Sequence, residues 1–435
     1  MKKTHRLSVL ASLLFVSGAA RADVSTLNLG LDYTLRGIGI KNNDGVPSTK
    51  DNLSYTSHQA RAYLSGWLTE DVEAGFRVQS INIWGLEGST SAPVTRYPAA
   101  DGTPWIEQIY VHLPNLAGKH LDLTIGRQPI VIGDGMLVSD DQLGFNAIRA
   151  KISLPRGLGL DLFTAKVKET LSANQDSNLN GAVAALNQGD NRWELSWINE
   201  DTGGPSEYTL GRTTTTASSV KRTFYDLRLF GDLKDAYYKL ELAIGKGTAK
   251  VGDQKIAIDG IGEKLELGAQ SDTARFGRFG VKALYASGSG DDEGTTDKDE
   301  SFRPTFAHRW DGLQRAGWGQ HFGATLSDAY NPSAPFSSNG TGLPPGASGI
   351  KTLGFGIFTV QRVNWTGSID YYTFDSRVKV SAKNSLGAEL DLGLVYRYTS
   401  YLTFSLGDAI FFPGDTYGDS VAKVTRYTAD ARLHF

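Results

Sequence analysis

The final stretch of the chain, Lys423–Phe435, reads KVTRYTADARLHF. Alternate residues from Tyr427 to Phe435 are apolar or aromatic, and the residues between them are polar or charged. Successive side chains of a strand point to opposite faces, so this stretch predicts a strand with one apolar and one polar face. In a soluble sandwich the apolar face would pack on a second sheet, whereas in a membrane barrel it contacts lipid and the polar face lines a watery lumen. The phenylalanine that ends the strand on its apolar face favours the barrel.

The same alternation recurs along the whole chain in segments of about ten residues, separated by turn signals. These segments number about 18, an even number within the range of outer-membrane barrels. Connections after even-numbered segments are short, such as Thr69–Asp71 and Pro155–Gly157, whereas the others are mostly long. Short periplasmic turns that alternate with long extracellular loops are typical of such barrels. The sequence therefore predicts an all-β fold, a transmembrane antiparallel up-and-down β-barrel, with the longest loop, Ser289–Gly349, exposed outside the cell.

Residues 1–22 have the pattern of a secretory signal peptide. Lys2, Lys3 and Arg6 form a basic start, and the apolar run that follows is too short to span a bilayer. Ala20-Arg21-Ala22 then fits the small-x-small cleavage signature. We expect residues 1–22 to be removed and residues 23–435 to form one barrel domain in an outer membrane of the Gram-negative type.

The composition excludes several classes of site. The chain contains no cysteine, which excludes disulfides, cysteine-ligated zinc, iron–sulfur clusters and covalently attached haem. Its formal net charge of −3 argues against a nucleic-acid binder. No phosphate-binding loop, zinc motif or nucleophile elbow occurs, so we expect no metal, no cofactor and no catalysis. The expected partners are outer-membrane lipid and a small anionic or saccharide solute, and a periplasmic export partner is left open.

Charged residues gather on the polar parity of the predicted strands, where basic residues slightly outnumber acidic ones. A basic surplus inside a low-dielectric wall concentrates anions and favours their entry. For any single residue, an ion pair that knits neighbouring strands and merely fills the lumen is the commoner role. The arginines that parity places in the pore lining are Arg36, Arg61, Arg77, Arg362, Arg397, Arg426 and Arg432.

One stretch is more individual than the rest: residues 125–150 read IGRQPIVIGDGMLVSDDQLGFNAIRA. It resembles the alginate-export family of outer-membrane porins, which carries this run of Gly-Arg-Gln, Gly-Asp-Gly, Ser-Asp-Asp and Gly-Phe-Asn-Ala-x-Arg. Tyr285-Ala286-Ser287-Gly288, followed by acidic residues, is similar to a second landmark of that family. The resemblance implies a monomeric barrel of about 18 strands whose arginine-lined lumen conducts a polyuronate outward. The family's alginate exporter is associated with a long periplasmic lid, which the short connections here do not contain, so an anion-preferring or oligosaccharide channel is implied rather than gated polymer export.

The resemblance carries two arginines over to this chain, Arg127 and Arg149, with Asp134, Asp140 and Asp141 as members of the loop between them. A barrel of about 18 strands is too wide to select by its wall alone, so we expect this loop to fold inward. The two arginines then lie near the narrowest point and favour anions, with the three aspartates orienting them. Alternatively, the aspartates only neutralise the arginines and pin the loop.

Two other classes of protein stay open from the sequence. An outer-membrane hydrolase would need a nucleophile, a base and a carboxylate close together on the barrel wall. A scaffold or adhesion barrel would have a plugged lumen. The acidic stretch Asp291–Glu300 also has carboxylates that suit calcium, but it lacks the spacing of a calcium loop, and a solvated acidic loop fits it better.

Overall fold

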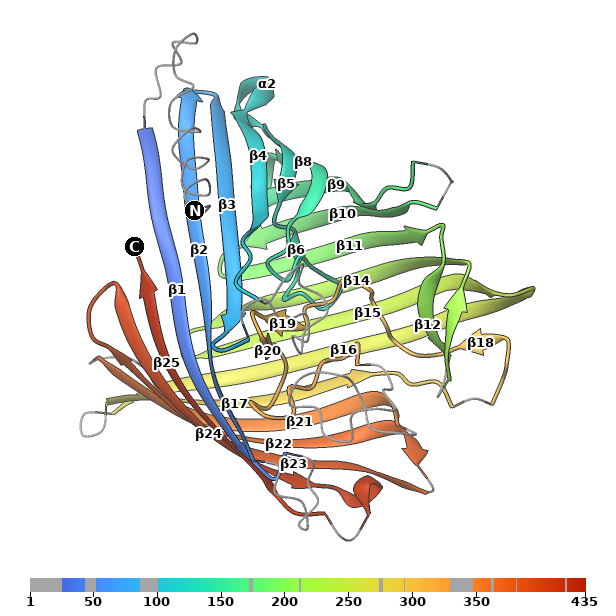
Figure 1. Cartoon of the computed structure of the whole chain (residues 1–435). Helices are drawn as coiled ribbons and strands as arrows, with labels where there is room; N and C mark the ends of the chain where they lie inside the picture. Colours follow the sequence, from blue (N-terminus) through green and yellow to red (C-terminus); the bar gives the residue numbers. More distant parts are fainter. Residues whose placement is uncertain are drawn as a thin grey trace, which may run out of the picture.

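The computed structural model describes residues 26–43, 52–86, 101–171, 175–210, 213–273, 277–292, 294–328, 347–360, 364–380, 382–418 and 421–435. Within these residues, eighteen long strands form one ring in chain order (Figure 1). They are β1 (Thr26–Lys41), β2 (Leu53–Thr69), β3 (Val72–Ile83), β4 (Trp105–Asn115), β5 (Leu121–Gln128), β8 (Phe145–Ser153), β9 (Leu158–Lys168), β10 (Ser177–Gln188), β11 (Asn191–Thr202), β14 (Ser219–Leu233), β15 (Ala236–Val251), β16 (Gln254–Thr273), β17 (Gly277–Gly288), β21 (Ser348–Val360), β22 (Trp365–Val380), β23 (Lys383–Arg397), β24 (Leu402–Pro413) and β25 (Val424–His434).

Shorter elements lie in the connections. They are β6 (Val131–Ile132), β7 (Val138–Ser139), β12 (Ser206–Leu210), β13 (Thr213–Ala217), β18 (Lys298–Asp299), β19 (Trp310–Asp311), β20 (Gln314–Arg315), the helical turn α2 (Leu116–Lys119) and the 3-10 turns η1 (Pro155–Gly157) and η2 (Asp415–Tyr417). None of the helices among the described residues is long and apolar enough to cross a membrane.

The ring closes between its first and last long strands. β1 and β25 pair antiparallel, from Asp32 opposite His434 to Lys41 opposite Thr425. Closure satisfies the backbone hydrogen bonds of both strands, which a wall surrounded by lipid requires because lipid offers no donors or acceptors. The predicted fold class, a transmembrane antiparallel up-and-down barrel, is confirmed.

Strand bounds follow the alternation where it is regular. β5 and β9 begin and end where the sequence pattern places them. β15 and β16, by contrast, are longer than the alternating segments 237–245 and 264–270 from which they are predicted. Their additional residues carry charge on the outer face, where Lys246 and Asp259 form an ion pair of 2.5 Å. The sheet continues past the lipid into water, where apolar–polar alternation is no longer required.

The outer face of the ring is apolar. Leu29 and Leu406, for example, are 69% and 58% exposed. On β23, Leu392 is exposed, whereas its neighbour Asp391 and nearby Glu389 point inward and are buried. The parity that the sequence assigns to lipid therefore faces outward in the structure.

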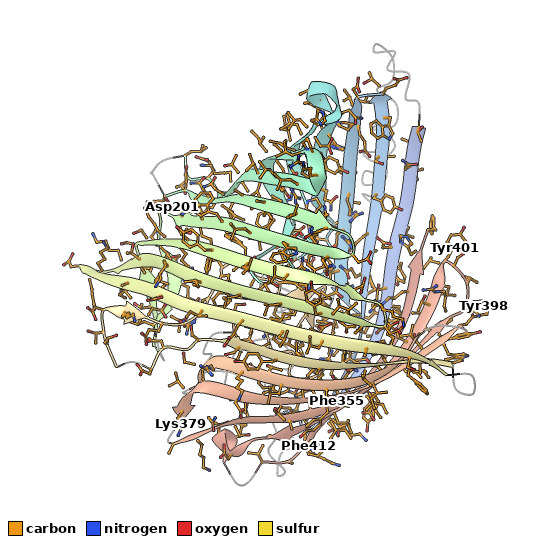
Figure 2. All side chains as sticks on the ribbon, turned by 180° about the vertical axis from the view of Figure 1, so that it is seen from behind. Asp201, Phe355, Lys379, Tyr398, Tyr401 and Phe412 are labelled. Atoms are coloured by element: carbon orange, nitrogen blue, oxygen red, sulfur yellow. The ribbon has the colours of Figure 1, made fainter. Side chains whose placement is uncertain are left out.

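Aromatic residues mark the end of the barrel that carries the short turns. Trp365 stacks on Tyr396 with 4.2 Å between the ring centroids. Tyr398 and Tyr401 lie at the same end of the strands, opposite the end that carries Lys379 (Figure 2). Such residues are typical of the boundary between lipid and water, because their rings are apolar and their edges polar.

Two connections fold into the ring and pack against its inner face. We call them inner segment 129–144, which joins β5 to β8 and contains β6 and β7, and inner segment 301–328, which contains β19 and β20. Of these short strands, β6, β19 and β20 are labelled inside the ring of long strands in Figure 1. Phe322 of the second segment stacks on Phe374 and Phe411 of the wall at centroid distances of 4.5 and 5.2 Å. Phe302 meets Phe224 edge to face at 6.0 Å. These rings belong to an apolar cluster between the inner segments and the half of the wall nearer the long loops.

The expectation that the loop Ser289–Gly349 is exposed outside the cell is wrong for inner segment 301–328. Phe302 is buried, as is every residue from His321 to Asp328. The physical reason is composition, because a loop this rich in large apolar residues gains more by packing inside the wall than by contact with water. Residues 329–346 of the predicted loop lie outside the described residues.

Candidate functional site

Inner segment 129–144 lies between the two arginines that the sequence singles out, Arg127 on β5 and Arg149 on β8. Arg127 donates to the carbonyl of Leu143 at 2.5 Å and so ties the end of the segment to its start. Asp140 accepts the N–H of Gly144 at 3.0 Å, in a left-handed turn where an added Cβ at Gly144 would lie 2.2 Å from the carbonyl oxygen of Glu107. Only glycine fits that approach without strain.

Arg149 makes a two-pronged ion pair with Asp161 on the neighbouring strand β9. Its Nε and one terminal nitrogen lie 2.9 and 2.5 Å from the two carboxylate oxygens. The other terminal nitrogen donates to the carbonyl of Pro129, at the start of the inner segment, at 3.2 Å. Arg127 and Arg149 thus use their donors on different partners, and these contacts favour the pinning role over a joint selectivity site; selection by this pair stays a prediction.

Asp134 joins inner segment 129–144 to the wall on the other side of the lumen. Its carboxylate pairs with Arg228 on β14 at 2.5 Å and with Lys264 on β16 at 2.8 Å. Burial alone would raise the pKa of Asp134, but Lys264 and Arg228 outweigh it and hold the pKa below its ordinary value. The segment therefore spans from the β5–β8 side of the wall to the β14–β16 side. Arg228 lies on the predicted polar parity, but a single sequence gives no means of pairing it with Asp134.

Asp140 and Asp141 are both buried and serve different contacts. Burial, together with the nearby carboxylates of Glu107 and Asp141, raises the pKa of Asp140 to about 6. Asp141 accepts the backbone N–H of Arg309 at 3.2 Å and lies 2.8 Å from Nδ1 of His308. Asp141 therefore joins the two inner segments to each other.

Four of the remaining predicted arginines lie on the wall near the closure of the barrel, where two carboxylates are each shared by two guanidinium groups. Asp430 on β25 lies 2.6 Å from Arg36 and 3.3 Å from Arg432, and we call this the Asp430 unit. In the Glu107 unit, Glu107 on β4 lies 2.5 Å from Arg61 and 3.6 Å from Arg77. Each unit has one more positive than negative charge.

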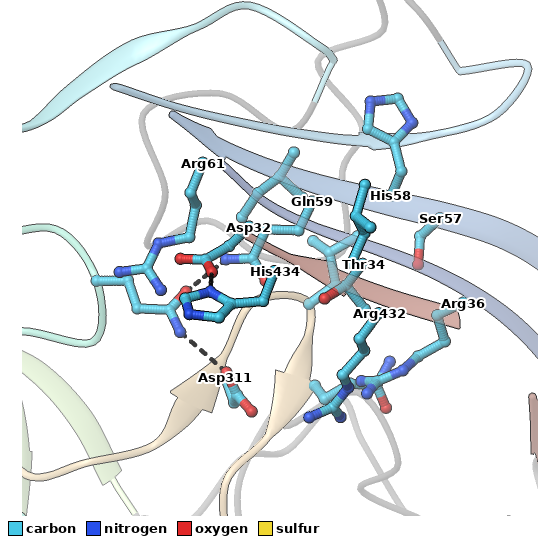
Figure 3. A pocket seen from close by; sticks show the side chains of 15 residues that line it. Asp32, Thr34, Arg36, Ser57, His58, Gln59, Arg61, Asp311, Arg432 and His434 are labelled. Atoms are coloured by element: carbon cyan, nitrogen blue, oxygen red, sulfur yellow. Dashed lines mark hydrogen bonds and ion pairs between the residues drawn. The ribbon is translucent and has the colours of Figure 1, made fainter. Parts of the chain in front are cut away.

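A cavity of about 290 Å³ opens beside both units (Figure 3). Arg36, Arg61 and Arg432 line it from β1, β2 and β25, and the hairpin β19–β20 bounds it on the other side. There Asp311 accepts a hydrogen bond of 2.9 Å from Gln142 of the other inner segment. The imidazole of His58 turns away from the cavity, whereas the guanidinium groups of Arg36 and Arg432 lie close to each other (Figure 3).

A second cavity of about 440 Å³ continues from the first. The two share Arg36, Asp311, Gln314 and Arg432. The second runs on past Arg315 and Gln320 of the inner segment and past Gly393 and Arg426 of the wall. We call the two cavities together the arginine path.

Three predicted residues have other positions. Arg426 is buried and donates to the carbonyl of Gln320 at 2.6 Å, so it holds inner segment 301–328 as well as lining the path. Arg397 is exposed at the end of β23 that carries the short turns. Arg362 lies outside the described residues. Sequence reasoning missed Arg315 because it lies in the supposed external loop.

A serine, a histidine and an aspartate do lie together, but not in the arrangement of a hydrolase. Oγ of Ser139 and Oδ1 of Asp141 lie 3.2 and 2.8 Å from the same ring nitrogen of His308, Nδ1. In a Ser-His-Asp triad the serine and the aspartate lie at opposite ring nitrogens, so that the proton of the serine can pass to Nε2. The cluster here joins the two inner segments.

The acidic stretch Asp291–Glu300 is engaged by protein donors. Asp299 accepts hydrogen bonds from the hydroxyl of Tyr208 at 2.6 Å and from the N–H of Ser301 at 3.0 Å. Within the part of the chain that the structure describes, no group of three or more histidines and carboxylates is arranged to hold a metal ion.

Comparison with known proteins gives both a family and a fold. The sequence model for alginate export matches residues 26–324. No curated protein matches the chain. Among solved structures, OpdO of Pseudomonas aeruginosa is 12% identical with a TM-score of 0.55, covering 95% of this chain and 98% of that one. OccK9 (OpdG) of the same organism is 10% identical with a TM-score of 0.57 and coverages of 95% and 99%, and OccAB1 of Acinetobacter baumannii is 8% identical with a TM-score of 0.55 and coverages of 96% and 98%. At such identities the likeness shows a shared fold.

Proposed function

Because this chain belongs to the alginate-export family of outer-membrane barrels, we propose that it is a channel for hydrophilic solutes that prefers anions, acidic saccharides among them. The observation that carries the proposal is the arginine path with its Asp430 and Glu107 units. In each unit two guanidinium groups share one carboxylate, so one positive charge is left without a matching negative charge. This surplus borders open space in a low-dielectric wall.

Arginine suits this role for geometric reasons. Its planar guanidinium presents donors in a fixed fork that matches the two oxygens of a carboxylate, such as that of a uronate. Arg432 is the best placed of the group, because its side chain is 51% exposed and its contact with Asp430 is the longer of the two in that unit. An arriving carboxylate can take over its free donors without removing Asp430 from Arg36.

Acidic residues on the same path reduce the surplus but do not cancel it. Asp32 and Asp311 also line the first cavity. Asp32 contacts Nδ1 of His434, and Asp311 accepts its hydrogen bond from the neutral Gln142. The arginines that line the path or belong to its two units are Arg36, Arg61, Arg77, Arg315, Arg426 and Arg432. The carboxylates that line the path or pair with these arginines are Asp32, Asp311, Asp430, Glu107 and Asp328, one fewer than the arginines.

The other candidate residues receive supporting roles in the proposal. Arg127, Arg149, Asp134, Asp140 and Asp141 hold inner segment 129–144 in place, so they narrow the lumen rather than bind the solute. The leader of residues 1–22 directs the chain to export and is then removed. The channel works as a monomer in outer-membrane lipid, without a cofactor and without a catalytic step.

Charge reversal on the path tests the proposal. We expect Arg432→Glu to shift the reversal potential of the channel in a salt gradient toward cations, as measured in planar bilayers. The matched control is Lys379→Glu, which makes the same change of charge at the rim of the long-loop end (Figure 2). An equal shift in both variants would assign the effect to overall charge and contradict the role of the path. A wild-type barrel that folds but does not conduct would favour the plugged scaffold.

A further inference from the structure

Two carboxylates of strand β23, Glu389 and Asp391, point into the lumen and accept hydrogen bonds from backbone N–H groups. Oδ2 of Asp391 accepts the N–H of Gln320 at 3.0 Å. The two oxygens of Glu389 accept the N–H groups of His321 and Phe322 at 2.6 and 2.9 Å. Three consecutive N–H groups of inner segment 301–328 are thus donated to the wall, and we call Glu389 and Asp391 the carboxylate clasp.

The geometry of the clasp needs convergent acceptor oxygens and a glycine. Consecutive N–H groups that converge in a turn form a concave site for such acceptors. Gly319, which precedes the three donors, has a φ of +83°. An added Cβ there would lie 2.6 Å from Oε2 of Glu389, so a side chain would push the segment off the wall.

Apolar contacts also hold inner segment 301–328 against the wall. Phe322 stacks on Phe374 and Phe411, and His321, which is fully buried, lies 5.6 Å from the ring of Phe411. On the other side, Arg426 of β25 donates to the carbonyl of Gln320. Donor and acceptor groups of the same short stretch are therefore tied to two different wall strands.

The clasp determines where the arginine path ends. Gln320, whose backbone is held by Asp391 and Arg426, lines the second cavity of the path. Its side chain lies over β24, since an added Cβ at Gly407 would be 2.4 Å from its Oε1. The second cavity lies along β23–β25, and the segment closes its end at Gln320, where the backbone is tied to the wall. Solute is left with the space beside the Asp430 and Glu107 units.

We propose that Glu389 and Asp391 are positioning residues that set the width and the selectivity of the channel without touching the solute. This inference rests on the proposed function, since it assumes that solutes pass along the arginine path. Release of the clasp extends the second cavity along β23–β24 past Gln320, which gives solutes a route that avoids the Glu107 unit. Conductance then rises and the preference for anions falls, in contrast to Arg432→Glu, which changes selectivity without a wider opening.

The test uses the full mature barrel in planar bilayers, with Glu389→Ala and Glu389→Gln. An amide of the same size retains one of the two acceptor oxygens and alanine retains neither, so conductance should increase from wild type to Glu389→Gln to Glu389→Ala. For Ala we expect a rise of about twofold or more, because a second opening conducts in parallel with the first. The matched control is Glu266→Ala, which removes an inward-facing carboxylate of β16 that pairs loosely with Lys239 at 3.9 Å.

A second readout is independent of conduction. Arg315 is almost fully buried in its ion pair with Asp328, and trypsin should cleave there readily only after the inner segment is released. Faster cleavage together with higher conductance supports the inference. Unchanged conductance and cleavage in a folded Glu389→Gln or Glu389→Ala barrel overturn it, even where Arg432→Glu still shifts selectivity. If the wild type does not conduct, the proposed function fails, and cleavage at Arg315 alone decides whether the clasp holds the segment.

Discussion

Two outward-facing leucines of similar exposure should respond differently to arginine. Leu240 on β15 is 37% exposed, and Leu392 on β23 is 40% exposed. The cross-strand neighbours of Leu240 are Leu229 and Leu265, so an arginine there meets only apolar side chains and lipid. Near the middle of the bilayer this should cost about 2–4 kcal/mol.

Leu392 has a different neighbour. It lies opposite Asp408 on β24, whose side chain must face outward because the adjacent Gly407 faces Gln320 in the lumen. Among the described residues, Oδ1 of Asp408 has no hydrogen-bond partner. An arginine at position 392 can donate to this carboxylate, and a hydrogen bond to a charged group contributes about 1.5–3 kcal/mol. The net cost of Leu392→Arg should therefore be about 1 kcal/mol.

The free energy of unfolding of each barrel in phospholipid vesicles, measured by denaturant titration, gives the comparison. Combining Leu392→Arg with Asp408→Asn should restore the larger cost, and the double-mutant cycle isolates the pair. Equal destabilisation by Leu240→Arg and Leu392→Arg, with no coupling to Asp408, would mean that the outer face or the register of β23 and β24 is assigned wrongly.

Three further predictions concern the inner segments. Asp134→Ala leaves Arg228 and Lys264 without their shared carboxylate, so conductance and anion preference should both rise in planar bilayers; a fall in anion preference would count against the crossing of the lumen by this segment. Gly319→Ala should release the clasp, because a left-handed backbone with a clash costs about 1–3 kcal/mol. Trypsin should then cleave inner segment 301–328 faster. Unchanged cleavage would contradict the close approach of Gly319 to Glu389. Burial lowers the pKa of His321 to about 3, below its ordinary value of 6.5. The docked segment is therefore most stable above pH 6.5 and loses stability as the pH falls toward 3. Conductance in planar bilayers should rise in acid, and His321→Phe should reduce that rise.

The strands were predictable because lipid and water impose a strict alternation on them. β5 and β9 show this most clearly, since both their bounds follow from the pattern. The alternation does not predict strand ends where no lipid surrounds the strand, as in β15 and β16, which continue beyond the lipid. It also fails on the inner face: Ile38 and Ile40 share the parity of Arg36 yet are buried and apolar. Apolar residues on both faces at the long-loop end of a strand are the signal that something packs inside the barrel.

The candidate site was predictable in its residue types but not in its partners. Parity placed Arg36 and Asp430 inside the lumen, but their direct opposition depends on the register in which the last strand meets the first. That register is fixed by the closure of the whole ring, which no local pattern encodes. The clasp depends on contacts between an apolar loop and a distant wall strand, and only the folded chain brings His321 to Glu389.

The reversal potential of the wild-type channel in a potassium chloride gradient tests the central claim most directly. The surplus of guanidinium charge along the arginine path predicts a potential of the sign that chloride permeation gives, and a double variant with Arg36→Gln and Arg432→Gln should bring it toward zero. A potential of the opposite sign in the wild type, or one that the double variant leaves unchanged while the barrel stays folded, would contradict the account.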